Sequence, residues 1–226
     1  MAKIIIQEET TKNPLSLIGK EAGICWGADI LDKDKNIKRA VDCIKSGHGR
    51  VMEYPQIYFV IDGYSAKVVR EFYTHIGSLP SRLQASTRYI NYSDFDYIVP
   101  PTIEGNSVAD EKYRETMNTI SKCICELIDL GIPNEDATMV LPLAMTTKVV
   151  VRTNLRHLVD MSRQRTCLRA YHEYRNLMRD LIKELRNYSD EWATIVDDLG
   201  VFHAKCKDLG YCPEKNGCGR FKKKGE

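Results

Sequence analysis

The chain has 226 residues and a mass of 25.9 kDa, enough for one large domain or two small ones. Its 33 Lys and Arg residues against 31 Asp and Glu leave a formal charge of +2, a balance that does not favour a nucleic-acid or anionic-membrane surface. No apolar run reaches the length of a membrane span, and the N-terminal segment lacks the apolar core of a secretion signal. We therefore expect a cytoplasmic protein whose main domain, residues 1–202, binds any anion through a local site.

Apolar periodicity and turn residues predict the elements of the first half of the chain. Asp62-Gly63 is expected to end a buried strand, and Gly77 is expected to end the helix that follows it. In chain order we expect a strand at Lys3–Ile6, a helix at 36–46, a strand at 56–61, a helix at 65–77, a loop at 78–84 and a strand at 86–92.

The second half alternates in the same way. A helix at 111–130 is expected to end at Gly131, and Asn134 is expected to cap a short helix after it. The β-branched run at 146–153 predicts an extended segment, and a longer helix is expected at 168–186. Together these elements predict an α+β domain with a mixed or antiparallel sheet flanked by helices.

The segment Gln84-Ala85-Ser86-Thr87-Arg88-Tyr89 carries the clearest binding signal. Ser86 and Arg88 are two residues apart, so their side chains point the same way if the segment is extended. A hydroxyl and a guanidinium aimed at one spot can bind a phosphate group. Lys148 and Arg165 add positive charge from other segments, and the Gln84 amide can read the edge of a base.

With the flanking motifs Thr74-His75-Ile76-Gly77, Pro80-Ser81-Arg82 and Tyr89-Ile90-Asn91-Tyr92, this segment resembles the signature region of the flavin-dependent thymidylate synthases. The resemblance runs from about Ala22 to Leu185. It implies the conversion of dUMP to dTMP, with methylenetetrahydrofolate giving the carbon, reduced FAD giving the hydride and NADPH reducing the flavin. It also implies a homotetramer whose active sites are shared between subunits.

The resemblance assigns residues to the nucleotide. Those implied to bind dUMP are Gln84, Ser86, Arg88, Lys148 and Arg165, of which Gln84 and Lys148 stand where the family usually has Glu and Arg. Arg165 is implied to draw electron density toward a ring carbonyl, so that C5 of the pyrimidine can act as a nucleophile. The competing interpretation is that Arg165 only stabilises the C-terminus of a helix through the helix dipole.

The resemblance also assigns a flavin site, with one departure. The residues implied to bind FAD are His48, Glu53, His75, Arg82, Asn154 and Arg156. Thr74 and Ile76 stand where the family usually has two arginines around the histidine, and Arg82 can restore one positive charge. Helix capping is the competing interpretation for His75 and for Asn154.

The C-terminal extension, residues 203–226, lies outside the resemblance. It contains His203, Cys206, Cys212 and Cys218, with the three cysteines at equal intervals. One imidazole and three thiolates can form a structural zinc site, and these four residues are the predicted ligands. The alternative is three unpaired cysteines in a mobile tail.

Three other functions stay open at this point. One is a sister reaction that leaves a hydroxymethyl group on C5 of the pyrimidine, and another is a non-catalytic paralogue that binds dUMP without flavin. Analysis of the product separates the first from thymidylate synthesis, and flavin content separates the second. Nucleic-acid binding is the weakest, because the basic run near the C-terminus is short and has no aromatic platform.

Overall fold

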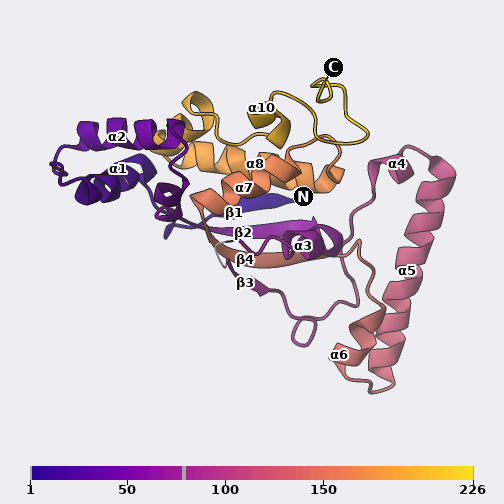
Figure 1. The fold of residues 1–226 in the computed structure, drawn as a ribbon. Helices are drawn as coiled ribbons and strands as arrows, with labels where there is room; N and C mark the ends of the chain where they lie inside the picture. The colour runs from indigo at the N-terminus through magenta and orange to yellow at the C-terminus, as the bar shows by residue number, and fades with distance from the viewer. Residues whose placement is uncertain (1, 78–79, 226) are drawn as a thin grey trace. The chain divides into compact units, whose positions relative to one another are not determined.

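A computed structural model describes residues 2–77 and 80–225 of the chain. Its strands form one antiparallel sheet in the order β1-β2-β4-β3 (Figure 1). The strands are β1 (Lys3–Ile6), β2 (Gln56–Ser65), β3 (Ser81–Gln84) and β4 (Thr146–Asn154). With the helices given below, this sheet makes an α+β fold, and the predicted fold class is confirmed.

The chain divides into two compact units, and each strand contributes residues to both. The smaller unit contains residues 2–3, 61–74 and 83–149. The larger unit contains residues 4–60, 75–82 (of which 78–79 lie outside the described residues) and 150–225. The C-terminal extension belongs to the larger unit, so its predicted independence from residues 1–202 stays a prediction.

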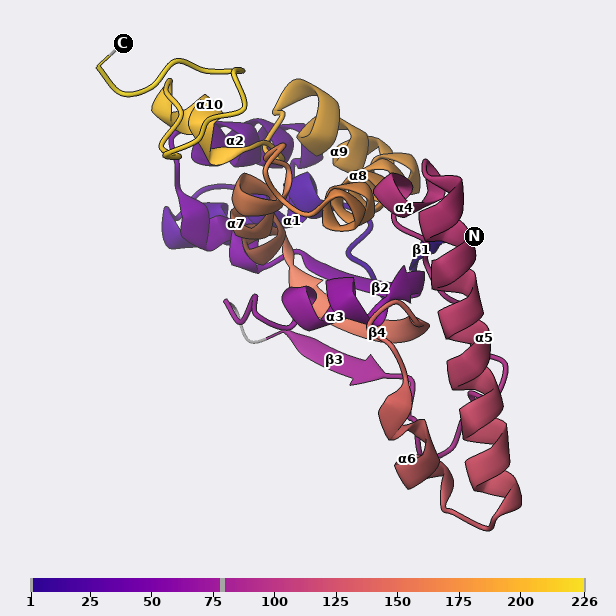
Figure 2. The same ribbon diagram turned by 90° about the vertical axis from the view of Figure 1, so that its right-hand side faces the viewer.

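The smaller unit is built around one long helix. Asn106 caps that helix by accepting a hydrogen bond from the backbone N–H of Ala109 at 3.1 Å. The core of this unit joins Met117 and Ile124 of the helix to Tyr92, Phe95 and Met145. Figure 2 shows α6 beside the C-terminal end of α5. The helices of the unit are α3 (Ala66–Phe72), α4 (Pro101–Glu104), α5 (Ser107–Asp129), α6 (Asn134–Ala137) and the 3-10 turn η2 (Thr138–Val140).

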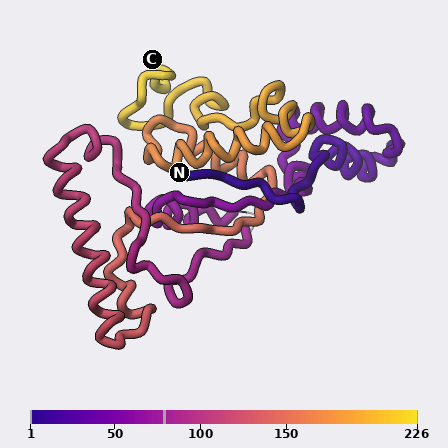
Figure 3. The backbone as a smooth tube through the Cα atoms, turned by 180° about the vertical axis from the view of Figure 1, so that it is seen from behind, coloured from indigo at the N-terminus to yellow at the C-terminus, as the bar shows by residue number. Residues whose placement is uncertain are grey.

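The larger unit holds most of the helices. Helices α1 and α2 lie side by side, and α10 lies beside α7, close to the C-terminal segment (Figures 1 and 3). The elements are α1 (Pro14–Cys25), α2 (Lys33–Lys45), η1 (Gly49–Glu53), α7 (Leu155–Arg165), α8 (His172–Tyr188), α9 (Asp190–Ala193), the π-helical turn η3 (Thr194–Asp198) and α10 (Lys205–Leu209).

Helices α1 and α2 touch backbone to backbone at Gly19. A Cβ atom built on Gly19 would lie 1.8 Å from the carbonyl oxygen of Asn36, so no larger residue fits unless the helices separate. Arg39 reinforces the crossing, because its Nη1 donates to the Gly19 carbonyl at 2.8 Å. The sequence did not predict α1, since its two internal glycines interrupt the apolar pattern.

Two predictions for residues 84–92 and the segment that contacts them are wrong. Residues 86–92 form a turn and irregular backbone in place of a strand, and the strand β3 occupies part of the predicted loop. Asn134 does not cap α6: its Nδ2 donates to the carbonyls of Thr87 and Ile90 at 2.7 and 2.9 Å. That contact stabilises the turn, and a side chain so distant in sequence could not be paired with it in advance.

Other boundaries differ by a few residues. Helix α3 ends at Phe72 and not at Gly77, because the Thr74 hydroxyl donates to the Glu71 carbonyl and closes the last turn. Ser78 and Leu79, the start of the predicted loop, lie outside the described residues. Of the helices that the structure describes, none is long and apolar enough to span a membrane.

Candidate active site

His75 and Arg165 form the centre of a network in the larger unit. The Nε of Arg165, the last residue of α7, donates to Nε2 of His75 at 2.9 Å. The guanidinium carbon lies 4.6 Å from the centre of the Tyr174 ring, which is fully buried. Arg82 donates to the backbone carbonyl of His75. The structure therefore joins two residues predicted for the flavin to the arginine predicted for the pyrimidine.

The imidazole of His75 is uncharged at neutral pH. Burial lowers its pKa from 6.5 to about 4, and the positive charges of Arg165, His157 and Arg82 act in the same direction. Since Nε2 accepts the hydrogen bond from Arg165, the proton of the neutral ring is on Nδ1. A neutral acceptor leaves the full charge on Arg165 and fixes the plane of its guanidinium group.

His157 completes this network, although sequence reasoning did not select it. Its side chain is 4% exposed and lies edge-on to His75, with ring centres 6.4 Å apart. Burial and the charge of Arg82 lower its pKa, and its Nε2 has no hydrogen-bond partner in the described structure. A histidine on the apolar face of α7 was the available signal, because a buried polar atom without a partner is uncommon.

A second group surrounds Arg156 in the same unit. Arg156 Nη1 and Glu53 Oε1 are 2.5 Å apart, and both side chains are about two-fifths exposed (42% and 43%). Arg156 lines a cavity of about 400 Å³, with Lys45, Gly47 and Gly49 among its other lining residues. Lysine and arginine beside glycine backbone suit an anionic group.

Asn154 and His48 have other surroundings. The Asn154 side chain caps α7 by accepting from the backbone N–H of His157 at 3.0 Å, as the competing interpretation expected. His48 lines a separate cavity of about 110 Å³ with Trp26 and Tyr54. Of the residues predicted for FAD, the structure thus pairs Glu53 with Arg156 and His75 with Arg82, and it keeps His48 in a cavity of its own.

In the smaller unit, Ser86 and Arg88 do not point to one spot as an extended segment would. The Ser86 hydroxyl accepts from the backbone N–H of Arg88 at 3.2 Å, inside the turn. The Arg88 guanidinium instead lies 2.7 Å from the Glu135 carboxylate, and both side chains are mostly exposed. A phosphate group would have to displace this carboxylate, which costs little because an exposed ion pair contributes only about 0–1 kcal/mol.

Gln84 and Lys148 lie on adjacent strands of the sheet. The backbone N–H of Ala85 donates to the Lys148 carbonyl at 2.8 Å, which continues the pairing of β3 with β4. Gln84 approaches Thr147 at 3.5 Å, and because successive side chains in a strand face opposite ways, Lys148 lies on the other face. Lys148 is paired with Asp62 at 3.2 Å. The structure does not bring these two side chains together.

The predicted zinc ligands are only partly brought together. Cys206, Cys212 and Cys218 line one cavity, but His203 lines the cavity next to Arg156. The Nε2 of His203 lies 3.3 Å from the Asp208 carboxylate. Cys167 lines the cavity of the three cysteines and His203 does not, and the predicted set of four ligands stays a prediction.

Comparison with known proteins identifies the family. A family profile described as thymidylate synthase complementing protein matches residues 8–189 of this chain. The chain belongs to the flavin-dependent thymidylate synthase family. The family predicted from the Gln84–Tyr89 segment and its flanking motifs is thereby confirmed.

The sequence similarity to individual flavin-dependent thymidylate synthases extends over almost the whole chain. The flavin-dependent thymidylate synthase of Nitratidesulfovibrio vulgaris is 29% identical over 93% of this chain and 92% of its own length. That of Thermococcus kodakarensis is 30% identical over 90% of this chain and 86% of its own length. A crystal structure of thymidylate synthase X from Helicobacter pylori with FAD and dUMP has a TM-score of 0.63, with 21% identity over 83% of this chain and 95% of that one. This last match shows a shared fold.

The residues present suit a flavin nucleotide. FAD carries an anionic pyrophosphate, and the cavity beside Arg156 offers the Lys45 and Arg156 side chains next to two glycines. A Cβ atom on Gly49 would lie 3.6 Å from the Arg156 guanidinium, at ordinary van der Waals contact. Lys45 and Arg156 are therefore the lining side chains whose charge suits such a group, and the carboxylates of Asp160 and Asp208 line the same cavity.

Proposed function

We propose that this protein converts dUMP to dTMP by reductive methylation, with methylenetetrahydrofolate as the carbon donor and NADPH as the reductant. FAD, when bound, supplies the hydride. The observation that carries the proposal is the contact between Arg165 and the neutral His75, because it fixes a cation at the position where the family resemblance implies action on the pyrimidine. Family membership and the FAD and dUMP in the Helicobacter pylori structure support the same conclusion.

Arg165 is the proposed catalytic residue. Its Nε is bonded to His75 and its face lies against Tyr174, so the planar group has little freedom to rotate. A fixed guanidinium beside a ring carbonyl stabilises negative charge that develops there in the transition state. The buried imidazole stays neutral at working pH, so it does not compete with the substrate as a second cation.

Phosphate binding is proposed for Ser86, Arg88 and Lys148, and reading of the base for Gln84. Arg88 and Lys148 are each paired with a carboxylate in the structure, Glu135 and Asp62. Substrate binding would exchange these exposed pairs for charge-assisted hydrogen bonds to the phosphate. The homotetramer and the cytoplasmic location that the family resemblance implies are part of the same proposal, and light scattering tests the assembly.

The deciding experiment is an absorbance spectrum of the purified protein. We expect bound FAD, bleaching of its absorbance by NADPH without oxygen, and dTMP formation when dUMP and methylenetetrahydrofolate are added. Arg156→Ala should weaken FAD binding and Arg152→Ala should not, because Arg152 is an exposed residue of β4 outside the cavity.

Other outcomes separate the alternatives. A protein that binds dUMP but neither carries nor takes up FAD would be the non-catalytic paralogue. A flavoprotein whose product is 5-hydroxymethyl-dUMP would catalyse the sister reaction. Either result would remove the proposed synthase activity.

A further inference from the structure

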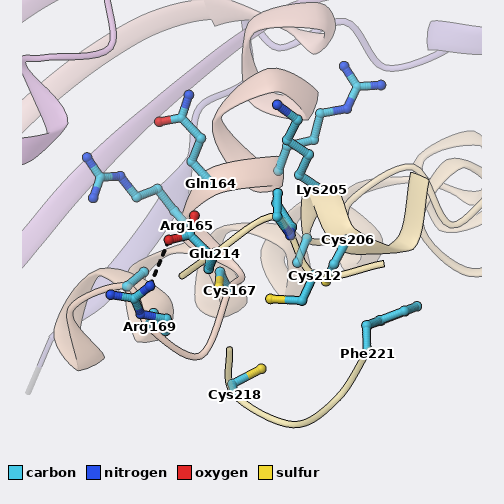
Figure 4. A pocket seen from close by; sticks show the side chains of 14 residues that line it. Gln164, Arg165, Cys167, Arg169, Lys205, Cys206, Cys212, Glu214, Cys218 and Phe221 are labelled. Atoms are coloured by element: carbon cyan, nitrogen blue, oxygen red, sulfur yellow. Dashed lines mark hydrogen bonds and ion pairs between the residues drawn. The ribbon is translucent and has the colours of Figure 1, made fainter. Parts of the chain in front are cut away.

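Four cysteines line one cavity of the larger unit. The cavity has a volume of about 480 Å³, and the cysteines reach it from three segments: Cys167 follows α7, Cys206 lies in α10, and Cys212 and Cys218 belong to the C-terminal segment (Figure 4). All four are free thiols, and Cys212 is only 8% exposed. Four thiols around one space are the donor set that Zn²⁺ and iron–sulfur centres use.

The backbone of the C-terminal segment is organised around Cys212. The backbone N–H of Cys212 donates to the Lys222 carbonyl at 2.7 Å, so the chain returns past this residue. A Cβ atom on Gly217 would lie 3.2 Å from the Cys212 sulfur, so glycine there lets the backbone pack closely against it. This segment is therefore folded back at the cavity.

The charge around the cavity matches a metal bound by thiolates. Four thiolates around one Zn²⁺ carry a net charge of −2, because each thiol gives up its proton on binding. Of the cations that line the cavity, Arg163 is paired with Asp160 and Asp208, and Arg169 is paired with Glu214, which also lines it. Lys205 is therefore the lining cation best able to offset that charge. Figure 4 shows the Arg165 side chain extending away from the four cysteines, so it is not used for this purpose.

The four cysteines line the same cavity, but their sulfur atoms are not within the distances of a metal site. In the described parts of the chain, no three His, Cys, Asp or Glu side chains already stand in the arrangement of a metal site. Gly210 and Gly219 have positive φ angles of 72° and 84° and flank the segment that carries Cys212 and Cys218. Closing the site requires the segment between these two glycines to shift so that the sulfurs of Cys212 and Cys218 approach those of Cys167 and Cys206.

We propose that Cys167, Cys206, Cys212 and Cys218 are the ligands of one thiophilic metal centre. His203 is not a ligand. The centre attaches the C-terminal segment to the loop that follows α7, two residues beyond Arg165. It is a site additional to the proposed flavin and nucleotide sites, and its existence does not depend on the proposed reaction.

The test is the metal content of protein made without a polyhistidine tag, with and without added Zn²⁺. We expect one zinc ion per chain in the wild type and loss of that zinc in Cys167→Ser. His203→Ala should keep the metal, and Cys125→Ser, an exposed cysteine of the smaller unit, is the matched control. This comparison separates the proposed set from one that uses His203.

A second measurement excludes loss of metal through misfolding. Limited proteolysis should leave residues 205–225 intact in the zinc-loaded wild type and cut them after chelation, while far-ultraviolet circular dichroism stays unchanged. Iron with acid-labile sulfide in place of zinc would support the same four ligands with a different metal. Retention of zinc by Cys167→Ser, its loss from His203→Ala, disulfides among the four, or no metal uptake would each overturn the proposal.

Discussion

The two groups of predicted site residues differ in how the fold holds them. In the larger unit, a hydrogen bond joins His75 to Arg165, Arg165 lies against the Tyr174 ring, and both side chains are half-buried. In the smaller unit, Arg88 and Lys148 are exposed and form ion pairs with Glu135 and Asp62. The first group is preorganised and the second must exchange partners when it binds an anion. A preorganised group acts on the transition state, and an exchangeable group sets affinity.

Among the variants considered, Arg165→Ala should have the largest effect, because it removes a residue of the preorganised group. Loss of a fixed charge at the reacting ring typically lowers kcat by about 10²–10³-fold, with a smaller change in dUMP affinity. Steady-state kinetics would measure both. Arg179→Ala is the control, since Arg179 is an exposed arginine of α8 that contacts Asp180 and lines neither cavity. An Arg165→Ala enzyme with normal kcat and weaker dUMP binding would place Arg165 in the exchangeable group.

The burial of His75 should appear as acid sensitivity. Its pKa falls from 6.5 to about 4 on folding, so the unfolded chain takes up the proton first as the pH drops. The stabilisation is complete above about pH 6.5 and is lost toward pH 4, on the order of 3 kcal/mol at 1.4 kcal/mol per unit. The lowered pKa of His157 acts in the same direction.

Urea unfolding at several pH values would measure this loss. His75→Gln keeps an acceptor for Arg165 and does not titrate, so its unfolding free energy should fall less between pH 6.5 and pH 4 than that of the wild type. His172→Gln is the control. Identical pH dependence in the wild type and His75→Gln would mean that His75 is not buried as described.

Arg88→Ala tests the exchangeable side. We expect dUMP binding to weaken by roughly 1.5–3 kcal/mol, the usual contribution of a hydrogen bond to a charged group. Calorimetric titration would measure it. Glu135→Gln removes the carboxylate that competes for Arg88, so it should bind dUMP at least as tightly as the wild type. Unchanged affinity in Arg88→Ala would remove this residue from the phosphate site.

Asn154→Ala should have the smallest effect. Loss of this cap should lower the unfolding free energy by about 1 kcal/mol, and Asn154→Asp should restore it. FAD affinity measured beside stability separates capping from contact with the flavin. A stable Asn154→Asp variant that has lost FAD would assign Asn154 a direct role in the cofactor site.

The parts of the fold that sequence predicts well are those with a strong local pattern. Helices α5 and α8 carry apolar stripes and were expected within about four residues of their ends. The turn at Ser86 and Arg88 was not, because Asn134 stabilises it from a distant segment. Local periodicity holds no information about such a contact.

The same limit applies to the site. Resemblance named His75 and Arg165 separately, but their hydrogen bond depends on how α7 meets the segment after α3. Spacing along the chain grouped His203 with Cys206, Cys212 and Cys218, whereas the cavity of these three cysteines is lined by Cys167 and not by His203. Spacing along the chain finds ligands only when they share one segment, and this cavity is lined from three.

The close approach of α1 and α2 at Gly19 makes the placement of α2 depend on a residue outside the candidate site. Even alanine there would collide with the Asn36 backbone, so the cost is displacement of α2 and not the loss of one contact. The chain leaving α2 leads through Gly47 into η1, which carries Glu53, the partner of Arg156. Inherited variation at Gly19 should therefore be as restricted as at a residue that touches the substrate, although no chemistry takes place there.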